Sequence, residues 1–239
     1  IILVDIGNTR TKYCIVNKEK NCAVQAISNT LINDNFLNKY FVNAARIIVA
    51  SVSHNKLTDG INSWCQIHKI AYQRVVSEKS KFKVTNAYQQ PSQLGVDRWL
   101  AMIGAADFFP NKNVLIIDAG TATTVDLLAA NGQHQGGWIL AGISTLVSSV
   151  LAETTRVMAN DKERESLAFS FNTSENVHNA AWAATIGAIN LAISQAKQQG
   201  FPLDNVLLTG GNGTLLSSLM SHQNKVIDGL VLRGLYAYI

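Results

Sequence analysis

Two eight-residue stretches of this chain repeat one pattern and decide the expected fold. Residues 2–9 read ILVDIGNT, and residues 115–122 read LIIDAGTA. Each is an apolar run typical of a buried strand, followed by Asp-x-Gly and a small residue. The two aspartates, Asp5 and Asp118, are 118 − 5 = 113 residues apart, close to half of the 239-residue chain. Such a repeat indicates a duplicated α/β unit, so we expect two similar lobes, residues 1–94 and 95–239.

Strand-like and helix-like patterns alternate around these two stretches. The polar, turn-rich residues 77–94 are the predicted region between the lobes, and residues 17–21 are predicted to form a hairpin turn. We expect strands at 1–6, 11–16, 22–27, 46–52, 73–76, 114–118, 123–128, 134–139 and 205–208, and helices at 34–42, 56–68, 95–109, 143–158, 174–199, 214–220 and 229–238.

The composition argues against several classes of protein. Twenty Lys and Arg against 16 Asp and Glu give a net charge of +4, and no basic cluster is dense enough for a nucleic-acid face. No apolar run reaches the roughly 18 residues that a membrane helix needs. Three cysteines, an odd and sparse set, favour a reducing compartment. We therefore expect no nucleic-acid partner and no membrane association.

The two Asp-x-Gly turns carry the chemistry that phosphate binding needs. A glycine after a strand allows the backbone to approach a ligand closely, and consecutive amides in such a turn can hold an anion. A carboxylate beside phosphates requires a cation between them, and Mg²⁺ prefers carboxylate, water and phosphate oxygens together. Asp5 and Asp118 therefore predict a nucleotide with cations, and Lys12 adds a positive charge. For a single copy, an ordinary Asx turn is the alternative interpretation.

Further motifs fall at spacings that match one known family. Gly210-Gly211 follows an apolar strand pattern, and Gly95-Val-Asp97-Arg98 follows the stretch 88–94, YQQPSQL. With the two Asp-x-Gly turns and Gly136-Gly137, these motifs resemble the type III pantothenate kinases of the actin, sugar-kinase and Hsp70 ATPase superfamily. The resemblance runs through essentially the whole chain. It implies an α/β fold of two duplicated ribonuclease H-like lobes, the actin-like ATPase fold, with an ATP cleft between them.

The resemblance also implies a reaction and a set of site residues. Pantothenate would be phosphorylated by ATP to 4′-phosphopantothenate, the first step of coenzyme A biosynthesis, with Asp97 as general base. Asp5 would hold Mg²⁺ through water, Asp118 would bind a monovalent cation, K⁺ or NH₄⁺, and the protein would be a cytoplasmic homodimer. The implied ATP-binding residues are Asp5, Ile6, Gly7, Asn8, Thr9, Arg10, Thr11, Lys12 and Thr121, and the implied pantothenate-binding residues are Tyr88, Gly95, Val96, Asp97, Arg98 and Thr173.

Two other functions are alternatives to the pantothenate kinase hypothesis. One is a regulatory protein, similar to a transcription activator, that keeps the scaffold but turns over weakly; the other is a kinase for another small alcohol. The presence of Asp5, Asp97, Arg98 and Asp118 favours an active kinase. One departure from the family is Ala141, where the family has proline, and the restored N–H and freed φ angle are expected to loosen that loop.

Overall fold

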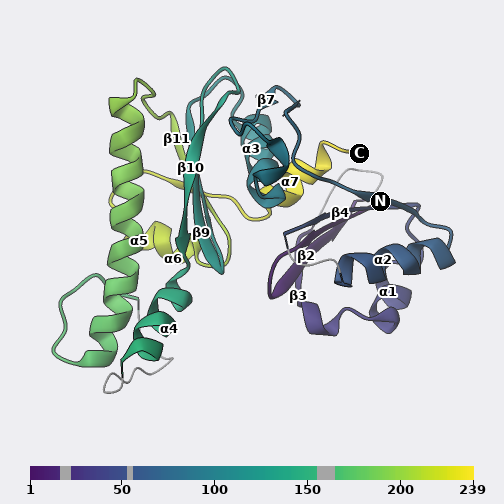
Figure 1. Cartoon of the computed structure of the whole chain (residues 1–239), viewed down its shortest axis with the longest axis horizontal. Helices are drawn as coiled ribbons and strands as arrows, with labels where there is room; N and C mark the ends of the chain where they lie inside the picture. Colours follow the sequence, from purple (N-terminus) through teal and green to yellow (C-terminus); the bar gives the residue numbers. More distant parts are fainter. Residues whose placement is uncertain (17–22, 53–55, 155–164) are drawn as a thin grey trace. The chain divides into compact units, whose positions relative to one another are not determined.

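The computed structural model describes residues 1–16, 23–52, 56–154 and 165–239. The predicted hairpin turn at residues 17–21 lies outside these ranges. The chain forms two compact units: unit 1 contains Ile1–Pro110 and Asp228–Ile239, and unit 2 contains Asn111–Ile227. Figure 1 shows the elements of both units along the chain.

Unit 1 is built on a five-stranded sheet in the order β3-β2-β1-β4-β5. β1 pairs antiparallel with β2 and parallel with β4, and β3 and β5 extend the two sides. The polar stretch 77–94 holds a small antiparallel hairpin, β6–β7, that was not predicted. The strands are β1 (Ile2–Ile6), β2 (Arg10–Ile15), β3 (Gln25–Ser28), β4 (Arg46–Ser51), β5 (Ala71–Arg74), β6 (Ser80–Lys81) and β7 (Val84–Thr85).

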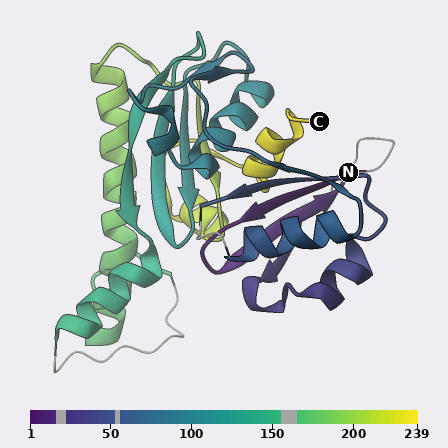
Figure 2. The ribbon, with the colours of Figure 1, turned by 45° about the vertical axis from the view of Figure 1, so that its right-hand side comes forward.

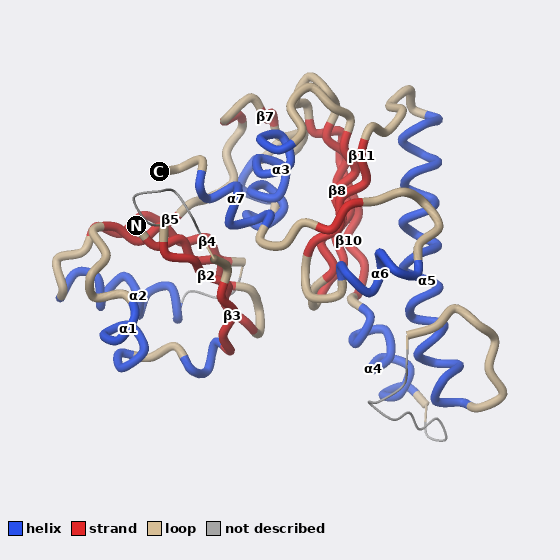
Figure 3. The backbone as a smooth tube through the Cα atoms, turned by 180° about the vertical axis from the view of Figure 1, so that it is seen from behind, coloured by secondary structure: helices blue, strands red, loops and turns tan. Residues whose placement is uncertain are grey.

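Helices cover both faces of this sheet. α1 (Asp34–Tyr40) and α2 (Lys56–Ile67) bury their apolar sides against alternate residues of β1 and β4, as the two-residue period of a strand requires. α3 (Val96–Phe108) and α7 (Leu230–Tyr236) pack on each other and against β4 and β1. Figure 3 shows the two helix pairs on opposite sides of the strands. Two short 3₁₀ turns, Asn29–Leu31 and Pro91–Gln93, complete unit 1.

The contact between α3 and α7 depends on two glycines. A β-carbon at Gly234 would lie 2.0 Å from the backbone oxygen of Leu100, and one at Gly104 would lie 2.5 Å from that of Leu230. The two helix backbones therefore approach more closely than any side chain allows. This close approach fixes the C-terminal helix to the helix that carries Asp97.

Unit 2 repeats the sheet of unit 1 in the order β10-β9-β8-β11-β12, with the same sequence of antiparallel and parallel pairings. The predicted duplication is thus present in the topology. All three described helices pack on one face of the sheet around a shared apolar core, and α5 runs along it in both views (Figures 1 and 2). The elements are β8 (Val114–Ala119), β9 (Ala122–Leu128), β10 (His134–Ala141), β11 (Asn205–Thr209), β12 (Lys225–Val226), α4 (Ile143–Glu153), α5 (Thr173–Gln198) and α6 (Gly213–Leu219).

The two compact units differ from the predicted halves 1–94 and 95–239. The predicted boundary followed the polar composition of residues 77–94, but α3 comes after that stretch and still belongs to unit 1. Its apolar side chains are buried and pack against α7 and β4, so the chain leaves unit 1 only after Pro110. The last twelve residues return to unit 1 for the same reason.

Two further observations bear on the expected setting of the protein. Cys14 is disulfide-bonded and Cys65 is a buried free thiol. In the part of the chain that the structure describes, no helix is both long and apolar enough to span a bilayer.

Candidate active site

The first Asp-x-Gly turn connects β1 to β2 in unit 1. Asp5 pairs with Lys12 in the antiparallel register, and the amide of Gly7 donates to the carbonyl oxygen of Arg10 at 3.0 Å. Residues directly opposite in an antiparallel pair project from the same face of the sheet. A carboxylate and an ammonium group therefore emerge together beside a tight, largely exposed turn, residues 7–10.

The inner side of this turn is held by Asn29, which follows β3. Its side-chain amide donates to the carbonyl oxygens of Gly7 at 2.9 Å and Asn8 at 3.2 Å, and its backbone amide donates to that of Thr9 at 3.1 Å. The hydroxyl of Thr11 donates to Asn29 Oδ1 at 2.8 Å, and Thr11 is fully buried. Thr11 thus supports the turn from within. Asn29 was not singled out in the sequence, because no local pattern links it to a turn twenty residues earlier.

The second Asp-x-Gly turn connects β8 to β9 in unit 2 and is tighter than the first. The amide of Gly120 donates to the carbonyl oxygen of Ala122 at 2.9 Å. The carbonyl oxygen of Thr121 accepts from the amide of Gly142 at 3.1 Å and from the hydroxyl of Thr145 at 3.2 Å. A β-carbon at Gly142 would lie 2.4 Å from the oxygen of Gly120, so the entry to α4 is pressed against this turn.

The neighbouring Gly-Gly turn of unit 2 meets Asp118. Gly210 has φ of 86°, and a β-carbon there would lie 2.4 Å from Asp118 Oδ1 and 2.6 Å from the oxygen of Ala119. Only glycine combines this left-handed backbone with such an approach. The structure therefore brings together the predicted cation ligand Asp118 and the Gly210-Gly211 motif. Ala141 is paired with Ala122 as the last residue of β10, so sheet pairing holds the position where looseness was expected.

Asn86, which is 0% exposed, holds the start of the segment that was predicted to bind pantothenate. Its side chain accepts from the amide of Tyr88 at 2.9 Å and donates to the carbonyl oxygens of Glu78 and Pro91, each at 3.3 Å. The Arg98 guanidinium donates to the Tyr88 hydroxyl at 3.1 Å and lies 5.9 Å from the centre of its ring. Tyr88 and Arg98, both predicted to bind pantothenate, are thus in direct contact.

Asp97 lies in the first turn of α3, after the N-cap residue Gly95. A carboxylate is favoured there by the helix dipole, and Asp97 Oδ1 accepts from the amide of Arg98 at 2.7 Å. A β-carbon at position 95 would lie 2.5 Å from the same Oδ1, so a side chain there would displace the carboxylate oxygen. Val96 is buried, whereas Asp97 is partly exposed and Arg98 is only 4% exposed.

The C-terminal tail supports α3 from behind. Trp99, next to Arg98, donates from Nε1 to the Tyr238 hydroxyl at 3.1 Å, and this hydroxyl donates to Glu78 at 2.9 Å. Burial raises the pKa of Tyr238 well above its ordinary value, so the phenol stays protonated and keeps its donor. Lys81 lies 4.5 Å from the centre of the Tyr238 ring. This bridge between residues 78 and 238 was not predicted, because no local pattern links residues so far apart.

The predicted site residues are divided between the two units. Unit 1 holds the turn Asp5–Lys12 and the segment Tyr88–Arg98, while unit 2 holds Asp118, Thr121 and Thr173. Thr173 is the exposed first residue of α5, and the exposed Phe169 and Phe171 precede it in the sequence.

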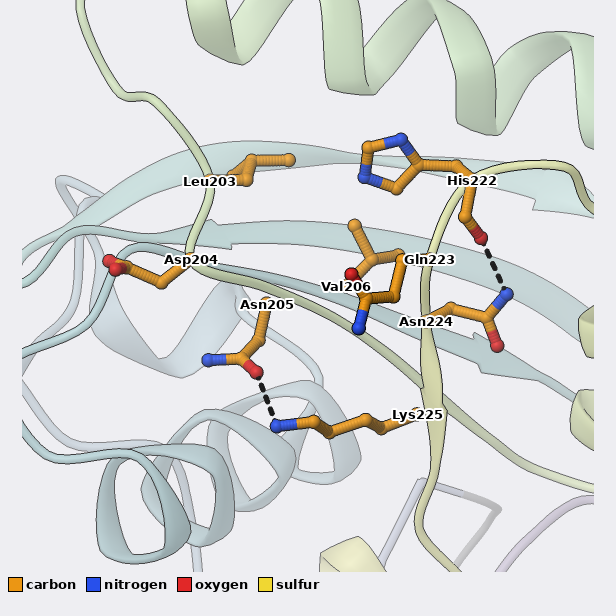
Figure 4. A pocket seen from close by; sticks show the side chains of 8 residues that line it. All are labelled: Leu203, Asp204, Asn205, Val206, His222, Gln223, Asn224 and Lys225. Atoms are coloured by element: carbon orange, nitrogen blue, oxygen red, sulfur yellow. Dashed lines mark hydrogen bonds between the residues drawn. The ribbon is translucent and has the colours of Figure 1, made fainter.

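A polar cavity of about 290 Å³ opens in unit 2 at the amino ends of β11 and β12. Figure 4 shows the residues that line it, with Lys225 donating to the side chain of Asn205. None of the site residues predicted from the sequence lines this cavity. The predicted turns instead follow the carboxyl ends of β1 and β8, where open α/β sheets bind ligands.

Comparison with known proteins places the chain in a family. The sequence model described as type III pantothenate kinase matches residues 1–195. A type III pantothenate kinase from Colwellia psychrerythraea (strain 34H) is 48% identical over 100% of this chain and 99% of that protein. One from Pseudoalteromonas translucida (strain TAC 125) is 33% identical over 98% and 94% of the two chains.

Solved structures confirm the predicted fold. A protein described as a Baf family transcriptional activator from Campylobacter jejuni has a TM-score of 0.64 at 24% identity, covering 99% of this chain and 96% of that one. A protein described as a 2-dehydro-3-deoxygalactonokinase from Sinorhizobium meliloti has a TM-score of 0.62 at 14% identity, covering 99% of this chain and 97% of that one. At these identities the likeness concerns the fold alone, that of actin-like ATPases and sugar kinases. By its sequence matches, the chain belongs to the type III pantothenate kinase family.

Proposed function

We propose that this protein transfers the γ-phosphoryl group of ATP to the primary hydroxyl of pantothenate, giving 4′-phosphopantothenate for coenzyme A synthesis. The observation that carries the proposal is the cluster at the start of α3. There the Asp97 carboxylate adjoins a buried Arg98 that is hydrogen-bonded to Tyr88. A base beside a fork of donors suits an acceptor that has both a hydroxyl and a carboxylate.

The turn at Asp5–Lys12 suits the phosphates of ATP. Phosphoryl transfer needs positioning and charge neutralisation more than covalent chemistry. The turn supplies backbone amides, and Lys12 supplies a point charge on the same sheet face as Asp5. In this proposal Ile6 to Thr11 shape the phosphate site, with Thr11 acting from inside the fold.

The donor set also fits two cations. Among the described residues no three His, Cys, Asp or Glu side chains cluster as a metal cage, and Mg²⁺ bound to a nucleotide ordinarily keeps several waters and takes one or two carboxylates. Asp5 would hold Mg²⁺ through water, and Mg²⁺ would neutralise charge on the phosphates. Asp118, pressed against Gly210, would hold a monovalent cation, K⁺ or NH₄⁺, beside the nucleotide contact of Thr121.

In the transfer step Asp97 takes the proton of the attacking hydroxyl as general base. The new bond joins that oxygen to the γ-phosphorus, the bond to the β,γ-bridging oxygen breaks, and ADP leaves with the bond electrons. Arg98 pairs with the pantothenate carboxylate as a bidentate donor, and its contact with Tyr88 holds the guanidinium in place. Gly95 and Val96 form the adjoining wall.

The test is ADP release from purified protein with ATP, Mg²⁺ and KCl, using pantothenate and a panel of other small alcohols as acceptors. The proposal expects turnover with pantothenate and strong dependence on K⁺ or NH₄⁺ over Na⁺. Turnover with another alcohol but not with pantothenate would favour a kinase of different substrate. The absence of turnover with every acceptor, with ATP still bound, would favour the regulatory alternative.

We also propose that this protein is a homodimer and that it acts in the cytoplasm, as the family resemblance implies. Thr173 and the exposed Phe169 and Phe171 lie together before and at the start of α5, which suits a contact with a second copy. Sedimentation equilibrium of the wild type and of a Phe169→Ser, Phe171→Ser double variant tests this. A monomeric wild type would exclude the homodimer.

A further inference from the structure

Asn29 lies outside every motif of the sequence, yet it donates three hydrogen bonds to the first Asp-x-Gly turn. It stands at the junction between β3 and the 3₁₀ turn Asn29–Leu31. Its amide groups donate to three consecutive carbonyl oxygens, those of Gly7, Asn8 and Thr9, at 2.9, 3.2 and 3.1 Å. Asn29 thus supplies a hydrogen-bond donor to each of these three carbonyl groups.

The direction of these carbonyl groups determines the direction of the turn's amides. Peptide bonds in the described residues are all trans, and in a trans peptide the C=O and N–H groups point to opposite sides. The carbonyl groups of Gly7 and Asn8 point at Asn29, so the amides of Asn8 and Thr9 point away from it. Two successive N–H groups directed to the outer side of an exposed turn form the arrangement that binds an anion.

Thr11 fixes which way the Asn29 carboxamide faces. Its hydroxyl is fully buried and donates to Oδ1 at 2.8 Å. A flipped carboxamide would set its oxygen against the carbonyl oxygens of Gly7 and Asn8, where no hydrogen bond can form. The Thr11–Asn29 bond therefore keeps the amide nitrogen on the turn.

We propose that Asn29 is a positioning residue for the nucleotide: it holds the carbonyl groups of residues 7–9 inward so that the amides of residues 8 and 9 face the phosphates. This role rests on the proposed function of the same turn. Asn29 itself touches no phosphate. Without its side chain, the two peptide groups can rotate, and a donor displaced by about 1 Å costs on the order of 10²-fold in rate.

The test compares Asn29→Ala with Asn33→Ala, its matched control. Asn33 lies on the same connection, where its side chain accepts from the Phe36 amide at 3.1 Å as the N-cap of α1. Removing this cap weakens the start of α1 without touching the turn. Steady-state kinetics with ATP and pantothenate varied separately, calorimetric titration with ADP, and thermal denaturation are measured for each variant.

We expect Asn29→Ala to lower kcat/KM for ATP by about 10- to 100-fold and to weaken ADP binding. KM for pantothenate stays within about twofold of wild type, and Asn33→Ala changes neither nucleotide parameter. Thr11→Val should lose less in the same parameters, and should add little in the Asn29→Ala background, because the two residues act as a unit. If Asn29→Ala fails to fold, Thr11→Val and ADP titration carry the test.

Equal kcat/KM for ATP in the Asn29 and Asn33 variants would overturn the inference, as would a loss that falls on pantothenate alone. ADP titration separates this outcome from failure of the proposed function. If wild type does not phosphorylate pantothenate but Asn29→Ala still weakens ADP binding relative to Asn33→Ala, the function is wrong and the role of Asn29 stands.

Discussion

Replacing Gly95 by alanine tests the position of the proposed base without changing the base itself. A β-carbon at position 95 would lie 2.5 Å from Asp97 Oδ1, and ordinary van der Waals contact begins at 3.4 Å. The carboxylate oxygen must therefore move by about 3.4 − 2.5 = 0.9 Å. Because a misplacement of about 1 Å in a reacting group costs on the order of 10²-fold, we expect kcat to fall by about 10- to 100-fold.

Stability should change little in the same variant. Gly95 has φ of −54° and ψ of 134°, which alanine adopts without strain. Alanine is a poorer N-cap than glycine by some tenths of a kcal/mol, and the less flexible unfolded chain offsets this by about 0.4–1 kcal/mol. Gly60→Ala in α2, where the added methyl group meets nothing within 4 Å, is the matched control and should keep wild-type kcat. Wild-type kcat in Gly95→Ala, at similar melting temperature, would refute the placement of Asp97 as the base.

Two further predictions concern the support of α3. Tyr238→Phe leaves the buried Trp99 Nε1 without its acceptor and should lower the free energy of unfolding by about 1–3 kcal/mol, measured by urea denaturation; an unchanged midpoint would contradict the bridge to Glu78. Gly234→Ala places a β-carbon 2.0 Å from the Leu100 oxygen and should cost about 1–3 kcal/mol or more, whereas a melting temperature equal to wild type would show that α3 and α7 do not pack as described.

Much of the fold could be predicted because its signals are local. The two Asp-x-Gly turns, each with its apolar strand, gave the duplication that appears as two sheets of identical order. The spacing of apolar residues predicted α2 and α5 to within one residue at each end. Local sequence could not assign α7 to unit 1, because its partner α3 lies more than a hundred residues earlier.

The site residues that belong to sequence motifs were predicted. The single polar residues that act through tertiary contacts were missed. Tyr88 and Arg98 were predicted to share a role, and they are hydrogen-bonded. Asn29, Asn86 and Tyr238 were not singled out. Their bonding partners are fixed only by folding, and an isolated asparagine or tyrosine in the sequence looks the same whether it holds a turn or faces water.

The central claim is that Asp97 accepts the proton of pantothenate during transfer from ATP. Its most direct test is to follow formation of 4′-phosphopantothenate by mass spectrometry with wild type and Asp97→Asn under saturating ATP, Mg²⁺ and K⁺. We predict product from the wild type and a kcat lower by about 10²- to 10⁴-fold in the variant, with ADP binding unchanged. Product formation at equal rates by the two proteins would contradict it.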